Sequence, residues 1–98
     1  MKPTYELVLG KTYYNKGFFN LGVSVDKFIR RDEGVIRIYL ANTDQYIDGR
    51  AVRTANQNGT PRIFAGSRLR DWFFKNFKQN DLVLVVIEAP NALRIIAK

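Results

Sequence analysis

Cysteine and histidine, the two side chains most often used for covalent and acid–base chemistry, are absent from this chain of 98 residues. Without cysteine there is neither a disulfide framework nor a thiolate nucleophile. Without histidine there can be no Ser-His-Asp triad, no histidine-dependent nuclease and no histidine-ligated zinc. These absences exclude the commonest hydrolytic sites.

Long hydrophobic runs are also missing. The longest apolar run, Leu82 to Ile87, is far too short to cross a bilayer. The residues after Met1 do not form the apolar segment of a signal peptide. A chain without cysteine suits a reducing compartment, so we expect a soluble, cytoplasmic protein with no membrane partner.

Acidic residues are few and scattered, which argues against metal-dependent chemistry. The common restriction-nuclease site places an acidic residue two positions before a lysine, so that a metal lies beside a cation; no acidic residue here has that neighbour. The only adjacent acidic pair, Asp32 and Glu33, is typical of a solvated turn. The seven glycines are dispersed and form no phosphate-binding loop. We therefore expect no enzyme activity, no metal and no cofactor.

Positive charge is what the chain has in excess. Sixteen Lys and Arg against nine Asp and Glu give a formal net charge of +7 and a pI near 10.0. Between Gly49 and Asn80, seven basic residues are opposed only by Asp71. This distribution is typical of nucleic-acid-binding domains. The alternative is a basic surface that serves only solubility.

Hydrophobic patterning predicts a mainly β domain of the α+β class. The expected strands cover residues 5–9, 18–23, 35–40, 46–54, 61–64, 82–87 and 93–96. Because 82–87 lacks alternation, we expect it to be buried on both faces. Helices are expected over 25–30, capped by Ser24, and over 68–78, capped by Ser67. In the second helix the apolar stripe consists of Leu69, Trp72, Phe73 and Phe77. We expect a single domain over residues 1–98, an open barrel of about seven strands with two short helices.

The polar segment from Arg53 to Arg62 carries the strongest functional signal. Arg, Asn and Gln are the side chains that read guanine and adenine edges by paired hydrogen bonds. Asn58-Gly59 favours a tight hairpin turn, which predicts a narrow two-stranded ribbon of a size that the DNA major groove admits. The expected base contacts are Arg53, Asn56, Gln57, Asn58 and Arg62, and Thr60 is a further expected DNA contact. The alternative is an ordinary solvated loop.

A second polar segment, Lys11 to Lys16, offers cations, hydroxyls and an amide. Its tyrosines could pack on a sugar–phosphate backbone or stack on an unpaired base, or one of them could cover the edge of the core. The expected secondary DNA contacts are Lys11, Tyr13, Asn15 and Lys16. The expected phosphate contacts are Arg30, Arg31, Arg50, Arg68 and Arg70.

The order of these elements resembles the DNA-binding pseudobarrel. Residues 18–28 resemble its strand-into-helix segment, and 69–77 followed by 81–85 resemble its second helix, turn aspartate and core strand. This fold is shared by plant B-three-like transcription-factor domains and by target- or effector-binding domains of some type II restriction enzymes. The resemblance covers nearly the whole chain in element order.

The resemblance implies that two arms grip the major groove of double-stranded DNA, one after the first strand and one between the fourth and fifth. The matching positions are 11–16, which is short and aromatic here, and 53–62. It further implies the sequence-specific recognition domain of a restriction or related defence endonuclease, whose catalytic domain lies outside this chain.

Two other functions are consistent with the sequence. A small barrel that binds single-stranded DNA or RNA would need exposed aromatic side chains on a sheet face, whereas we expect most aromatics in the core or in the helix stripe. A protein-interaction domain would use an exposed strand edge.

Overall fold

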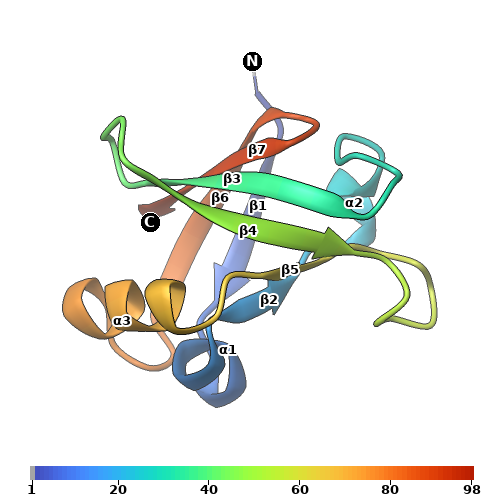
Figure 1. Cartoon of the computed structure of the whole chain (residues 1–98). Helices are drawn as coiled ribbons and strands as arrows, with labels where there is room; N and C mark the ends of the chain where they lie inside the picture. The colour runs from blue at the N-terminus through green and yellow to red at the C-terminus, as the bar shows by residue number, and fades with distance from the viewer. Residues whose placement is uncertain (1) are drawn as a thin grey trace.

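A seven-stranded sheet curls into a half-barrel in the computed structural model, which describes residues 2–98 (Figure 1). The strands are β1 (Thr4–Val8), β2 (Phe18–Asn20), β3 (Gly34–Leu40), β4 (Tyr46–Val52), β5 (Arg62–Phe64), β6 (Leu82–Ala89) and β7 (Ala92–Ala97). Their order is β1-β6-β7-β3-β4-β5-β2, and β3–β7 is the one parallel pair among them. The prediction of a mainly β open barrel is confirmed.

Three short helices accompany the sheet over residues 2–98, one more than we predicted: α1 (Lys11–Lys16), α2 (Val23–Asp26) and α3 (Ser67–Asn76). The predicted serine caps are wrong. Gly22 and Gly66 are the N-cap residues of α2 and α3, and neither helix has a side-chain cap hydrogen bond. The α2 helix is also a single turn that ends well before Arg30. None of these helices is long and apolar enough to cross a membrane.

The core lies inside the curl of the sheet and follows the period-two pattern of the strands. On β4, Ile47, Gly49 and Ala51 face inward. The α3 helix closes one end, with Leu69 and Phe73 fully buried. Trp72 and Phe77 pack partly buried against this core, as the predicted apolar stripe requires, but the helix ends at Asn76 and Phe77 is its extended C-cap residue.

The β6 strand corrects one prediction. We expected the run from Leu82 to Ile87 to be buried on both faces, but burial alternates along it. Val83 and Val85 are fully buried, whereas Leu84 and Val86 are only partly covered. A half-barrel encloses one face of its sheet and leaves the other toward solvent, so even an uninterrupted apolar strand has an outer face here.

The junction between α1 and β2 depends on Gly17. Its φ of +73° is left-handed, and a Cβ there would lie 2.0 Å from the carbonyl oxygen of Gly66. In turn, the amides of Ala65 and Gly66 both donate to the Gly17 carbonyl at 3.0 Å. This backbone contact attaches α1 to the segment that joins β5 and α3.

Candidate nucleic-acid interface

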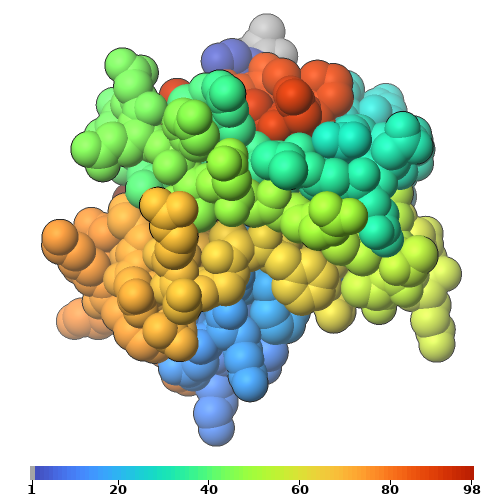
Figure 2. Space-filling model, viewed as in Figure 1, coloured from blue at the N-terminus to red at the C-terminus, as the bar shows by residue number. Residues whose placement is uncertain are grey.

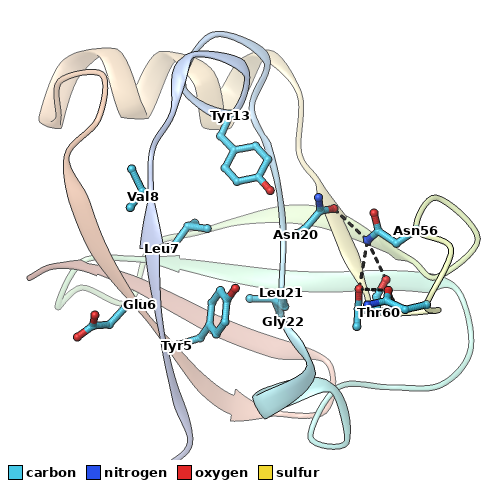
Figure 3. Close-up of a pocket in the computed structure, with 11 residues that line it drawn as sticks. Tyr5, Glu6, Leu7, Val8, Tyr13, Asn20, Leu21, Gly22, Asn56 and Thr60 are labelled. Carbon is cyan, nitrogen blue, oxygen red and sulfur yellow. Dashed lines mark hydrogen bonds between the residues drawn. The ribbon is translucent and has the colours of Figure 1, made fainter.

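A cleft of about 530 Å³ lies between β1 and β2, the two edge strands of the open sheet (Figure 3). Residues 5–8 of β1 form one wall. Tyr13 of α1 lines it, as do residues 20–22 at the end of β2. We call residues 53–61, which connect β4 to β5, the arm loop. Asn56, Asn58 and Thr60 of this loop complete the lining of the cleft. The cleft therefore joins both segments that the sequence marked as DNA contacts.

Aromatic and amide groups give this cleft its chemistry. In Figure 3 the rings of Tyr5 and Tyr13 point from β1 and α1 toward the β2 side, where Asn20 lies. The Tyr5 ring packs on Gly22, where a Cβ would lie 2.8 Å from it. Tyr5 and Asn20 were not singled out from the sequence. The signal for Asn20 was its position between Phe19 and Leu21, since strand alternation turns it away from the core.

The first predicted arm is a helix that packs on the protein. Tyr14 donates its hydroxyl hydrogen bond to the Phe77 carbonyl at 2.8 Å, and Tyr13 contacts the Phe18 ring edge-on at 5.5 Å. Both tyrosines thus cover the edge of the core. The Asn15 amide donates to the Lys11 carbonyl within the helix. Lys11 and Lys16 remain exposed at its two ends.

The second predicted arm is a looped segment, not a two-stranded ribbon. The β4–β5 ladder stops where Val52 lies opposite Arg62. Beyond that pair the chain turns on itself, with the Gly59 amide donating to the Asn56 carbonyl at 3.1 Å and Gly59 at a φ of +75°. Asn58 Oδ1 accepts hydrogen bonds from the amide and hydroxyl of Thr60, which fixes the tip.

Arg53 lies inside the protein, and its side chain is only 13% exposed. Nε donates to the Arg30 carbonyl at 3.0 Å, and Nη2 donates to the carbonyls of Asp26 and Ile29 at 3.1 and 3.0 Å. Nη1 donates to the Gly59 carbonyl and to the Asp26 carboxylate. The hydrogen bond from Arg53 lowers the pKa of Asp26 below its ordinary value. All three nitrogens are engaged, so Arg53 holds the arm loop against α2 instead of facing a base.

Asn56 and Arg62 join the arm loop to β2. Asn56 Nδ2 donates to Asn20 Oδ1 at 3.1 Å and to the Thr60 carbonyl at 3.0 Å. Arg62 donates from Nε to Asn20 Oδ1 at 2.8 Å and from Nη2 to Asn56 Oδ1 at 3.2 Å. Thr60 is buried. These side chains build the loop, while Gln57 and Asn58 are exposed at its tip.

The predicted phosphate contacts differ in their exposure and in the partners that their guanidinium groups already have. Arg30 donates to the backbone carbonyls of Asp32 and Val35 and is partly buried. Arg31 and Arg50 are mostly exposed, each beside one carboxylate. Arg70 pairs with Asp71 at 3.1 Å. Arg68 is exposed and, within residues 2–98, has no ion pair.

Aromatic side chains also lie where we did not expect them, on the outer face of the sheet. Tyr46 and Phe64 are exposed, and Phe18 and Tyr39 are partly exposed. The sequence signal was alternation: Phe18 precedes the buried Phe19, and Phe64 follows the buried Ile63.

Comparison with protein-family models finds no match, and neither does comparison with curated proteins. Across residues 2–98, no cluster of three or more acidic, His or Cys side chains could hold a metal ion.

Proposed function

We propose that this domain binds double-stranded DNA across the open edge of the half-barrel, with α1 on one side of the cleft and the arm loop on the other. One observation carries the proposal: a single cleft is lined by Tyr13 from the first segment that the sequence marked as a DNA contact and by Asn56, Asn58 and Thr60 from the second. The formal charge of +7 supplies the attraction to phosphates that every duplex binder needs.

The free groups at this edge suit different parts of a duplex. Lys11 and Lys16 are flexible point charges that suit phosphates. At the loop tip, the exposed Gln57 amide can pair with the N6 and N7 edge of adenine, whereas Asn58, whose Oδ1 accepts from Thr60, offers its Nδ2 as a donor. Arg53 and Asn56 contribute by holding the loop in one conformation, which lowers the entropic cost of binding.

The recognition role without chemistry comes from the pseudobarrel resemblance. In that role the domain selects a DNA sequence, and a nuclease domain elsewhere in a restriction or defence protein cuts it. The scattered carboxylates and the missing histidine support this division of labour.

Selection from a random pool of duplexes tests the proposal. We expect one motif to be enriched, and we expect Gln57→Ala with Asn58→Ala to relax it while leaving overall affinity within a fewfold. Lys11→Gln should instead weaken binding to all sequences alike, because a phosphate contact carries no sequence information. Lys2→Gln is the control: Lys2 is an exposed lysine, paired with Glu88, that precedes β1, whereas α1 follows β1 at its other end.

Three results would count against this reading. Absence of duplex binding at low salt would contradict DNA binding altogether. Binding without any enriched motif would limit the function to holding DNA. Equal effects of Lys2→Gln and Lys11→Gln would mean that the contact surface lies elsewhere.

A further inference from the structure

The outer face of the sheet carries a cluster of aromatic rings and arginine at its β2–β5 end. Phe18 lies opposite Phe64 in register, with ring centroids 5.5 Å apart. The Arg62 guanidinium lies 5.0 Å from the Phe18 centroid and 5.9 Å from that of Phe64. Phe64 is nevertheless 38% exposed. Exposed apolar rings gathered in one place on a sheet face mark a candidate interaction surface.

A second cluster of the same kind lies on β3, β4 and β7. Tyr39 and Tyr46 are opposite each other with ring centroids 5.6 Å apart. Arg37 lies 4.6 Å from the Tyr46 centroid, and Arg94 lies 4.9 Å from that of Tyr39. Tyr46 is 42% exposed.

The two clusters belong to one continuous surface. On β4, Arg50 lies directly opposite Phe64. It is four positions after Tyr46, a distance of roughly 13 Å along a strand. The Arg50 side chain is mostly exposed between them. In Figure 2 the surface over β4 and β5, coloured green to gold, faces the viewer without another segment covering it.

Charge indicates which partner suits this surface. Within residues 2–98, Arg62 has no ion pair, and Arg50 has one long one, 3.8 Å to Glu33. The face carries Arg37, Arg50 and Arg62 against Asp48, which lies opposite Arg37 in register. A polyanion complements such cations. Exposed aromatic and guanidinium planes stack on unpaired bases, but bases inside a duplex already stack on each other. Aromatic rings interleaved with cations therefore match a single strand.

We propose that the outer face, defined by Phe18, Arg37, Tyr39, Tyr46, Arg50, Arg62 and Phe64, binds single-stranded nucleic acid. Phe64 and Tyr46 stack on bases, and Arg37, Arg50 and Arg62 neutralise the phosphates between them. This face adjoins the cleft, because Arg62 donates to Asn20 and Asn56 of the cleft lining, but single-strand binding on it does not depend on duplex binding in the cleft.

Fluorescence anisotropy with a labelled oligothymidylate of about twenty residues tests the site. Its comparison is an abasic strand of equal length, which has the same charge but nothing to stack. We expect the thymidylate strand to bind at least tenfold more tightly than the abasic strand. A parallel titration with an oligouridylate of equal length shows whether a ribose strand binds as well. Equal affinity for the thymidylate and abasic strands, or binding of neither, would overturn the proposal.

Substitutions locate the contact. Phe64→Ala and Tyr46→Ala should each weaken thymidylate binding about tenfold, in line with the loss of one stacked base, and should leave abasic binding unchanged. Phe28→Ala is the matched control, because Phe28 is also 38% exposed but lies outside this face. Gln57→Ala with Asn58→Ala should not alter thymidylate binding, which separates this site from the cleft.

Photocrosslinking provides a readout that needs no substitution. An iodouridine strand should crosslink to Phe64 or Tyr46 in the wild-type protein. Crosslinks confined to Tyr5 and Tyr13 would place single strands in the cleft and would contradict the outer-face site.

Discussion

At the scale of single residues, Arg53 shows how an arginine in a DNA-binding pattern can serve the fold instead. The sequence places it at the start of a polar arm, which is the basis for predicting a base contact. Its acceptors on α2 and in the segment after it are more than twenty residues away along the chain. No local pattern encodes such a network, so the sequence could not reveal it.

Arg53→Ala is expected to destabilise the fold by about 2–3 kcal/mol, because it leaves a partly buried carboxylate and several carbonyl groups without a donor. Urea unfolding measures this. Arg31→Ala is the matched control: Arg31 contacts the same Asp26 carboxylate at 3.4 Å but is 67% exposed. Its removal should cost no more than about 0.5 kcal/mol. Similar effects of both substitutions would contradict the structural role of Arg53.

Two ion-paired carboxylates, Asp26 and Glu88, predict a loss of stability in acid. Hydrogen bonding to Arg53 lowers the pKa of Asp26. Hydrogen bonds from Lys2, the larger effect, and from Arg94 lower the pKa of Glu88. A carboxyl with a lowered folded-state pKa stabilises the protein above its unfolded-state pKa and loses that contribution as pH falls through the folded-state pKa.

We therefore expect the free energy of unfolding to fall progressively below about pH 5, since unfolded Asp and Glu titrate near pH 4. Asp26→Asn should be less stable than wild type at pH 7, and the gap should narrow on acidification. Urea titrations between neutral and acid pH measure it. A gap that stays constant with pH would show that the ionised carboxylate does not contribute.

At the scale of elements, the sequence was informative wherever one periodicity ran for several residues. Alternation on β4 and the apolar stripe of α3 are of that kind. The α1 helix escaped prediction because its six residues present no apolar face of their own. It is held instead by tertiary contacts, including the Tyr14 hydroxyl on Phe77 and the backbone of Gly17 on Gly66.

Two glycine substitutions test how α1 is held. Gly17 and Gly59 have nearly the same φ, +73° and +75°, but only at Gly17 would a Cβ collide with backbone. Gly59→Ala should cost about 1 kcal/mol, the ordinary penalty of a left-handed residue. Gly17→Ala should cost about 2–4 kcal/mol, since the junction must also shift. Thermal or urea unfolding compares the pair, and equal losses would contradict the tight junction.

At the scale of the whole molecule, an open sheet has two free edges, which a closed barrel lacks, and an outer face that meets solvent. The sequence predicted the open barrel and the basic character. It marked the two segments that line the cleft, but not that one is a helix or that the other is anchored by Arg53. The outer face went unnoticed because only the curvature decides which side of each strand meets solvent.

Duplex affinity should fall steeply with salt, because counterions are released from DNA as lysines and arginines take their place. Lys11→Gln should lower the slope of log affinity against log salt by about 1. Anisotropy titrations over a salt series, with Lys2→Gln alongside, measure both slopes. An affinity that responds little to salt would instead favour pairing of a strand edge with another protein.

The most direct test of the central claim is the map of amide chemical-shift changes when isotope-labelled protein is titrated with a short duplex at low salt. Duplex DNA across the cleft predicts the largest changes in residues 11–16, 20–22 and 56–60, with little change around Lys2 and Phe28. Changes centred outside the cleft, or none at all, would contradict duplex binding at the open edge of the half-barrel.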